Sequence, residues 1–420
     1  MNRLRAPNCP LVCAPMAFDL ITVALFGHPD LTVGERMRTP YARAIEADNF
    51  HVYAYPNDAS LGTVLSDVRP HVIFTFGKVE DFPRLLATPI DVRRRWLHFA
   101  PPYPEPAELA ITAETAFVDV ATNNRFPELP LVSVFTPTYR TGEKALRPFQ
   151  SLLDQTYRNW EWVVYDDSPE DDTFEYLRRF ADIEPRVRLF RSDRQCGRIG
   201  EVKRRCCGLA RGSIYVELDH DDELTDHCLA DLVEAFQTFP DAGFAYTDCS
   251  EPYEEGGFNW YGDTFAFDYG TYREEPYRGE ENVIQNYPSI NAKTVRHIVG
   301  MPNHARAWRA ELYHAIGGHG SEIHVVDDYE LCLRTFLATR MVHVQRHGYR
   351  QYLSRSGGNT QIRRNKEIQR LVRLFEARYE AQIHDRLVEL GVDDFIWRDG
   401  QLDWTVPNPD PTPIANYILR

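Results

Sequence analysis

Three closely spaced carboxylates follow an apolar segment near the middle of the chain. Residues 213–224 read SIYVELDHDDEL, and Asp219, Asp221 and Asp222 come directly after the apolar positions. Carboxylates at the end of a buried strand are costly unless a cation lies among them. Asp219 and Asp221 are two residues apart, so both side chains would point to one face of a strand. Oxygen ligands of this kind suit Mg²⁺ or Mn²⁺, which also bind substrate phosphates. The alternative is an acidic loop that caps the following helix.

A second acidic pair and a basic segment lie upstream of this cluster. Asp166 and Asp167 follow the apolar residues of EWVVY, and Arg198 and Lys203 flank the start of a predicted helix beside the turn RQCGRIG. Ligands of open α/β sheets gather at the carboxyl ends of the strands. There an acidic pair can accept hydrogen bonds from a base or ribose. A metal held by the other carboxylates can bind a diphosphate, and the two cations can neutralise the remaining charge. The pattern suits a nucleoside diphosphate.

Alternating strands and helices position these residues. Each acidic segment follows a predicted strand, and helices separate the strands along the chain. Such alternation is typical of a sheet that helices cover on both faces. The predicted strands are 131–135, 161–165, 187–190 and 214–218, and the predicted helices are 145–155, 171–179 and 201–209.

The first third of the chain shows the same alternation on a smaller scale. It predicts strands at 20–27, 51–55, 71–76 and 96–100, helices at 32–47, 60–68 and 82–87, and a further strand at 116–120. The segment GHPDLTVG after the first strand lacks the G-x-G-x-x-G pattern, so we do not expect a dinucleotide site there. The open roles for this region are structural, dimerising or acceptor-binding.

These patterns predict three parts. Residues 1–128 form a smaller α/β domain with a parallel sheet, and residues 129–365 form an α/β catalytic domain. Residues 366–420 comprise a long amphipathic helix at 368–390, which we expect to brace the body, and a proline-containing tail.

Net charge, cysteine distribution and the lengths of apolar runs indicate which partners and which compartment to expect. The chain has 420 residues and a net charge of −15, from 47 basic and 62 acidic residues, which argues against nonspecific nucleic-acid binding. The eight cysteines are scattered, which favours reduced thiols. We find no signal-peptide pattern and no run of about 18 apolar residues that could span a membrane. The expectation is a cytoplasmic protein without a membrane span.

Five motifs, in order, resemble the family 2 glycosyltransferases of the GT-A fold. They are VSVFTPTYR (132–140), VVYDDS (163–168), GLARGSIYVELDHDDEL (208–224), IGGHG (316–320) and VVDDYELCLR (325–334). The resemblance runs from Val132 to about Asn365, a little over half of the chain. It implies a Rossmann-like catalytic domain with a mixed central sheet, and it does not cover the first 130 residues.

The resemblance implies roles for individual residues. Asp221 would bind the metal, Mn²⁺ or Mg²⁺, and Asp219 would bind the ribose or the water shell of the metal. Asp166 or Asp167 would bind the base, which is uracil if the donor is UDP-linked. The remaining nucleotide-sugar contacts would come from Pro137, Tyr139, Arg140, Arg198, Lys203 and Arg355.

One acid at the start of a helix predicted at 329–337 would act on the acceptor. Members of this family invert the anomeric centre, so a carboxylate must take the proton of the attacking hydroxyl. The resemblance places Asp328 at the catalytic base. Family members usually carry Glu immediately before it, whereas this chain has Asp327, which leaves two adjacent acids as candidates. The alternative is that both acids favour the helix N-terminus.

The sequence says less about the residues that would bind the acceptor. Residues 253–277 are rich in aromatic side chains, which suit either sugar rings or ordinary loop packing. The Q-x-x-R-W signature of processive synthases is absent, since QIRRN (361–365) lacks the Trp, so we expect transfer of a single sugar.

We therefore expect a metal-dependent inverting glycosyltransferase for surface or extracellular glycans, with a UDP-sugar as the favoured donor. The acceptor would be a glycan, a lipid-linked sugar or a small molecule, and the N-terminal domain offers a route to an oligomer. The alternatives are a nucleotidyltransferase, which would want a glycine-rich phosphate loop after the first catalytic strand, and an inactive sugar- or nucleotide-binding module.

Overall fold

The chain contains two compact units in a computed structural model. The structure describes residues 21–27, 50–56, 59–60, 62, 64–65, 68–77, 92, 95–125, 129–192, 194–298, 300–356, 363–391 and 417–420. One unit comprises residues 1–77 and 95–122, and the other comprises residues 78–94 and 123–420. The predicted helices at 32–47 and 82–87 and most of the proline-containing tail lie outside the described residues.

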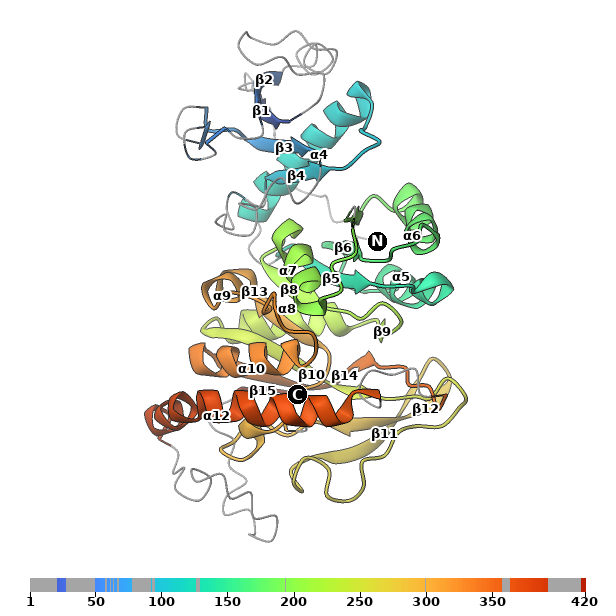
Figure 1. The fold of residues 1–420 in the computed structure, drawn as a ribbon, viewed down its shortest axis with the longest axis vertical. Helices are drawn as coiled ribbons and strands as arrows, with labels where there is room; N and C mark the ends of the chain where they lie inside the picture. The colour runs from blue at the N-terminus through green and yellow to red at the C-terminus, as the bar shows by residue number, and fades with distance from the viewer. Residues whose placement is uncertain are drawn as a thin grey trace, which may run out of the picture. The chain divides into compact units, whose positions relative to one another are not determined.

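The N-terminal unit is built on a small parallel sheet, as predicted. Its strands are β1 (Ile21–Phe26), β2 (Phe50–Tyr55), β3 (Val72–Phe76) and β4 (Trp96–Phe99), in the order β2-β1-β3-β4 (Figure 1). All three neighbouring pairs are parallel. The central strand β3 is buried along its whole length, which agrees with its continuous apolar sequence VIFTF.

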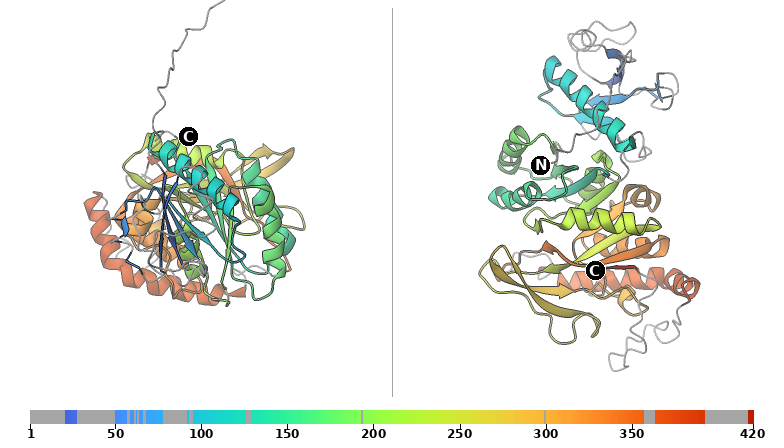
Figure 2. Two further views of the ribbon diagram at one scale, coloured as in Figure 1. Left: turned by 90° about the horizontal axis from the view of Figure 1, so that it is seen from above. Right: turned by 180° about the vertical axis from the view of Figure 1, so that it is seen from behind.

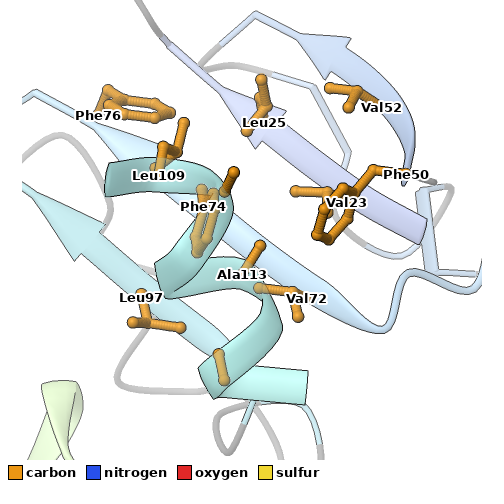
Figure 3. Close-up of a cluster of buried hydrophobic side chains, with 12 residues drawn as sticks. Val23, Leu25, Phe50, Val52, Val72, Phe74, Phe76, Leu97, Leu109 and Ala113 are labelled. Atoms are coloured by element: carbon orange, nitrogen blue, oxygen red, sulfur yellow. The ribbon is translucent and has the colours of Figure 1, made fainter. Parts of the chain in front are cut away.

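A long helix covers this sheet where the sequence predicted a connection with a strand at 116–120. That prediction was wrong, because Pro106–Arg125 forms helix α4. Pro106 occupies the first helical position, where it is tolerated, and alanines are frequent in the segment. Leu109 and Ala113 lie on one helical face and join the buried cluster around Phe74 (Figure 3).

The C-terminal unit is organised around a large mixed sheet. The strands run in the order β11-β12-β10-β13-β8-β5-β6-β7, and β14 lies beside β10 and also pairs with β9 and β15. The bounds are β5 (Val132–Thr138), β6 (Trp160–Asp166), β7 (Val187–Arg191), β8 (Ile214–Glu217), β9 (Glu223–Leu224), β10 (Ala242–Ser250), β11 (Thr271–Tyr277), β12 (Glu280–Asn286), β13 (Arg306–Arg309), β14 (Arg340–Arg350) and β15 (Tyr417–Leu419).

One half of this sheet has only parallel strands, and the other half contains antiparallel pairs. Strands β8, β5, β6 and β7 are parallel neighbours. Strand β13 runs antiparallel to β8, and β10 runs antiparallel to β13. The predicted α/β architecture with a mixed central sheet is thus confirmed, and the four strands predicted from the motif segments are β5 to β8.

Helices connect and cover the strands (Figures 1 and 2). They are η3 (Gly142–Ala145), α5 (Leu146–Leu153), α6 (Asp172–Ile183), α7 (Ile199–Leu209), α8 (Cys228–Thr238), η4 (Thr294–Arg296), α9 (Ala310–Ala315), α10 (Asp327–Ala338) and α12 (Asn365–Glu389). Helix α12 lies alongside α10, where Tyr379 Oη donates to Glu330 Oε1 at 2.6 Å. None of the helices in the described ranges has the length and apolar character needed to cross a membrane.

Candidate active site

The strand order creates a switch point at β5. From β5 the chain continues to β6 and β7 on one side and later returns to form β8 on the other side. Ligands of open α/β sheets bind in the crevice outside the carboxyl ends of the strands at such a point. Tyr139, Asp166 and Asp219 follow or end β5, β6 and β8, respectively. The topology therefore brings the predicted nucleotide-binding segments to one edge of the sheet.

The acidic loop after β8 presents two carboxylates and buries the third. The side chains of Asp219 and Asp221 are 33% and 30% exposed, whereas Asp222 is 2% exposed. Asp222 accepts hydrogen bonds from Tyr349 Oη at 3.0 Å and from the backbone N–H of Tyr352 at 2.7 Å. Burial, followed by the charges of Asp221 and Asp219, raises the pKa of Asp222. Asp222 thus anchors the loop, and the other two remain available to a ligand.

The same loop does not cap the following helix. Helix α8 begins at Cys228, and its N-cap residue His227 makes no side-chain capping hydrogen bond. The backbone of the loop is instead fixed from other elements. The N–H of Asp219 donates to Tyr349 Oη at 3.0 Å, and Arg147 Nη1 donates to the carbonyl of Asp221 at 3.0 Å.

The donor set fits a hard divalent cation that also binds its substrate. Within the described ranges, no group of three or more His, Cys, Asp or Glu side chains is arranged to hold a metal ion. Two exposed carboxylates, Asp219 and Asp221, leave most of a coordination shell to phosphate oxygens and water. Mg²⁺ bound through one or two carboxylates and substrate phosphates has this character. The anionic loop also gains from a cation, because the charges of Asp219 and Asp221 disfavour ionisation of Asp222.

The two acids after β6 are held differently. Asp167 accepts two backbone hydrogen bonds, from Cys196 at 2.6 Å and from Gly197 at 2.8 Å, and so ties down the turn before α7. Asp166 Oδ1 accepts hydrogen bonds from Thr138 Oγ1 at 2.9 Å and Ser168 Oγ at 2.6 Å. Its buried Oδ2 has no hydrogen-bond partner among the described residues, and burial raises the pKa of Asp166. Of the two, Asp166 keeps an acceptor atom unused.

The basic residues predicted for the nucleotide pocket have protein partners. Arg140 pairs with Glu170, and Arg198 Nη1 lies 2.6 Å from Glu322 Oε2, both pairs on the exposed surface. The guanidinium of Arg355 lies over the ring of Tyr253, 4.4 Å from its centroid. Among the remaining predicted contacts, Tyr139 is 42% exposed and Pro137 is buried within β5.

Lys203 belongs to a buried charge network centred on Glu217. Glu217 is fully buried at the end of β8, and its Oε1 lies 2.6 Å from Lys203 Nζ. Its Oε2 lies 2.9 Å from Arg306 Nε on β13. Lys203 also lies 3.1 Å from Asp327 Oδ2, and Arg306 Nη1 lies 2.9 Å from Asp328 Oδ2. One carboxylate therefore positions two cations, and each cation holds one acid of α10.

The two adjacent acids of α10 are in different environments. The Asp328 side chain is 27% exposed, whereas that of Asp327 is 5% exposed. For Asp328, burial acts to raise the pKa but is outweighed by Arg306 and then Lys203, so the pKa falls to about 2. For Asp327, burial dominates over the opposing charge of Lys203 and raises the pKa to about 6. Asp328 is thus the more accessible carboxylate, and it stays ionised to a lower pH than Asp327.

A neutral histidine bridges the acidic loop and the α10 network. His304 Nε2 lies 3.6 Å from Asp219 Oδ2 and 3.3 Å from Arg306 Nη2. Burial, followed by the charge of Arg306, lowers the pKa of His304 to about 4. Arg306 also binds Asp328, so His304, which accepts a hydrogen bond from Arg306, lies between Arg306 and Asp219. The predicted metal loop and the predicted base therefore lie beside the same two side chains, His304 and Arg306.

A protein-family model matches the segment that contains the acidic loop. The model for glycosyl transferase family 2 matches residues 133–314. These residues form a glycosyl transferase family 2 domain. Its relatives include the O-antigen biosynthesis protein RfbC of Myxococcus xanthus, 32% identical over 30% of this chain and 10% of that protein. They also include the chondroitin synthase of Escherichia coli, 25% identical over 56% of this chain and 30% of that protein.

The chain spans less than a third of the length of either relative. Among solved structures, that of S. aureus TarS 1–349 in complex with UDP-GlcNAc has a TM-score of 0.44 and 15% sequence identity. The match covers 61% of this chain and 71% of that chain.

Sequence reasoning missed three residues that organise the family 2 domain. They are Glu217, Arg306 and Arg147. Glu217 had a readable signal, because a charged residue interrupts the apolar strand IYVEL and a buried charge requires a partner. Arg306 and Arg147 had none, since their partners lie on β8, α10 and the acidic loop, far away in sequence.

Proposed function

We propose that the chain is a metal-dependent, inverting glycosyltransferase that moves a single sugar from a nucleoside-diphosphate sugar to an acceptor hydroxyl. The observation that carries this proposal is that Asp219 and Asp328 lie beside the same pair of side chains, Asp219 next to His304 and Asp328 paired with Arg306. The partly exposed carboxylates of Asp219 and Asp221, which suit a metal–diphosphate, therefore lie near the ionised carboxylate of Asp328, which suits proton abstraction. Membership of family 2 supports the same reaction class, and a UDP-linked donor is favoured.

The nucleotide would lie across the carboxyl ends of β5, β6 and β8. The exposed ring of Tyr139 would contact the nucleoside, and Asp166 Oδ2, which is buried, would accept a hydrogen bond from the base once its surroundings open to admit the base. Asp219 and Asp221 would hold Mn²⁺ or Mg²⁺, which stabilises charge on the departing diphosphate. Lys203 would act from within the protein by positioning Asp327, since it is buried between two carboxylates.

Asp328 would act as the general base. Its Oδ1 accepts a hydrogen bond from the N–H of Tyr329 at 2.7 Å, and its Oδ2 is held by Arg306. As the acceptor oxygen bonds to the anomeric carbon, the bond from that carbon to the diphosphate oxygen breaks and the acceptor proton passes to Asp328. Attack opposite the leaving group inverts the anomeric centre, and no enzyme nucleophile is needed.

We also propose a role in the synthesis of polysaccharides or other glycans. The names of the two relatives, an O-antigen biosynthesis protein and a chondroitin synthase, support this assignment. The absence of Q-x-x-R-W in the sequence supports transfer of one sugar per encounter.

The donor site is tested by thermal unfolding with Mn²⁺ and UDP, GDP or dTDP. A ligand present at about 100 times its Kd stabilises the folded state by about 2.7 kcal/mol. We expect the melting temperature of the wild type to rise with Mn²⁺ and UDP together, and Asp221→Ala to abolish the rise. The matched control is Asp182→Ala, which removes an exposed carboxylate on α6. If no nucleoside diphosphate raises the wild-type melting temperature, the proposed transferase is wrong.

A further inference from the structure

An exposed aromatic platform lies between β10 and β11. The side chains of Trp260 and Tyr261 are 56% and 43% exposed, although large aromatic side chains are favourable to bury. The Trp260 ring stacks on Tyr272 of β11, with 3.8 Å between ring centroids and 19° between planes. Contiguous exposed apolar surface of this kind marks a binding site more often than a random surface does.

A buried carboxylate holds the platform in place. Glu251 is fully buried, and its Oε2 accepts a hydrogen bond from Asn259 Nδ2 at 2.6 Å. Its Oε1 accepts one from Tyr261 Oη at 3.2 Å. The residues on both sides of Trp260 are therefore fixed to one side chain, and the N–H of Tyr261 also donates to Tyr272 Oη at 2.9 Å. Such a pre-organised surface loses little conformational entropy when a ligand binds.

Two short paths connect the platform to the candidate active site. Asn303 Nδ2 donates to Glu251 Oε1 at 3.3 Å, and the next residue, His304, lies 3.6 Å from Asp219. Along the backbone, the N–H of Gln351 donates to the carbonyl of Ser250 at 2.9 Å, one residue before Glu251. The following residue, Tyr352, donates its N–H to Asp222 in the acidic loop. The platform and the acidic loop thus share the same supports.

We propose that Trp260 and Tyr261 form a subsite for a pyranose ring of a saccharide acceptor. This inference rests on the proposed function, which requires an acceptor hydroxyl near Asp328. The apolar face of a sugar ring can stack on the tryptophan, and ring hydroxyls can hydrogen-bond to polar atoms at its edge, such as the hydroxyl of Tyr272. An anionic lipid surface suits the segment less, because residues 251–272 contain no Lys or Arg but include five Asp and Glu residues.

The binding test uses an array of neutral and acidic oligosaccharides of one to six pyranose units. The tightest binder is then titrated against wild-type protein by saturation-transfer NMR. We expect Trp260→Ala to weaken binding roughly tenfold or more, as truncation of a central aromatic anchor does. The control is Tyr53→Ala, which removes a 38% exposed aromatic side chain from β2. The inference is wrong if no saccharide binds the wild type, if Trp260→Ala binds as tightly as wild type, or if only anionic vesicles bind through Trp260.

A second measurement separates this inference from the proposed function. The thermal shift with Mn²⁺ and UDP should be the same in Trp260→Ala as in the wild type. The Trp260 ring stacks on Tyr272 of β11, which is not part of the acidic loop. Saccharide binding that depends on Trp260, without any nucleotide shift in the wild type, would retain the subsite and reject the transferase. A thermal shift with the nucleotide in a wild type that binds no saccharide would retain the transferase and reject the subsite. If Trp260→Ala is unfolded, Trp260→Gln provides the same comparison.

Discussion

At the scale of single residues, the functional distinction falls between two neighbouring aspartates. Asp327 and Asp328 differ in exposure and in pKa because Lys203 and Arg306 hold them from opposite sides of Glu217. A carboxylate with a pKa of about 2 is a weak base, but it is ionised throughout the physiological range. Its value as a base would come from position, since the acceptor proton needs an accessible carboxylate within hydrogen-bonding reach.

We predict that the two aspartates respond differently to substitution by asparagine. Asp328→Asn should lower the rate of sugar transfer by roughly 10²–10⁴-fold, the usual contribution of a general base. Asp327→Asn should cost less and should change the pH profile. The folded-state pKa of Asp327 is raised to about 6, so it is ionised at pH 7 and becomes protonated as pH falls through 6. Protonation removes a partner of Lys203, so the wild-type rate should fall below pH 6.

The measurement is release of the nucleoside diphosphate between pH 5 and 8, with sugars linked to the nucleoside diphosphate that the thermal shift identifies. Asp327→Asn should show no acid limb near pH 6, because residue 327 no longer titrates. The exposed acid variant Asp182→Ala should keep the wild-type profile. An acid limb near pH 6 that survives in Asp327→Asn, or full activity in Asp328→Asn, would contradict these assignments.

At the scale of secondary-structure elements, a second buried carboxylate ties the parallel half of the sheet together. Glu161 of β6 accepts hydrogen bonds from Ser133 of β5 at 2.6 Å and from the N–H of Arg211 at 2.6 Å. Its Oε2 lies 3.0 Å from Arg188 of β7 and 2.8 Å from the Arg211 guanidinium. One side chain thus connects three strands with the turn after α7. Burial acts to raise the pKa of Glu161 but is outweighed by Arg211 and then Arg188, so the pKa falls to about 2.

This arrangement predicts a loss of stability in acid. Since the folded-state pKa lies below the ordinary value of 4.5, the stabilisation is complete above pH 4.5 and is lost as pH falls towards 2. The difference corresponds to about 3 kcal/mol. At pH 7, Glu161→Gln should lower the free energy of unfolding by roughly 3–5 kcal/mol, because two largely buried arginines lose their counter-charge.

Urea unfolding at pH 7, 5, 4 and 3 measures this effect. The difference in free energy of unfolding between wild type and Glu161→Gln should narrow as pH falls below 4.5. Glu175→Gln, which removes the charge from an exposed pair on α6, should stay within about 0.5 kcal/mol of the wild type at each pH. A difference that remains constant from pH 7 to pH 3 would show that Glu161 does not titrate as described.

The elements also show what the sequence could and could not reveal. Strands β5 to β8 were predictable because each is a short apolar run bounded by turns or acids. The antiparallel strand β13 was not, because its polar ends, Arg306 and Arg309, conceal a strand of four residues. Without β13, nothing in the sequence places Arg306 opposite Glu217. The acids of the candidate site were therefore predictable as strand-end residues, whereas their cationic partners were not.

At the scale of the whole molecule, the two units have separate hydrophobic cores. The N-terminal core gathers side chains from β1, β2, β3, β4 and α4 around the fully buried Phe74 (Figure 3). The ring of Phe74 meets that of Phe99 edge-on, with 5.2 Å between the ring centroids. The alternation of strands and helices was enough to predict this sheet. It did not predict α4, because Ala-rich segments with a few β-branched residues carry no clear period and the tertiary context decides their structure.

Separate cores predict separate unfolding. Phe74→Ala should destabilise the N-terminal unit by roughly 3–5 kcal/mol, because the removed ring leaves a cavity among rigid neighbours. The C-terminal unit, which carries the candidate active site, should retain its melting temperature and its response to Mn²⁺ and UDP. Differential scanning calorimetry of the full chain should resolve two transitions, of which the ligand moves one and Phe74→Ala moves the other. Tyr53→Ala, on the exposed face of the same sheet, should move neither by more than about 4 °C. A shift of the ligand-sensitive transition in Phe74→Ala would mean that the N-terminal unit supports the catalytic unit energetically.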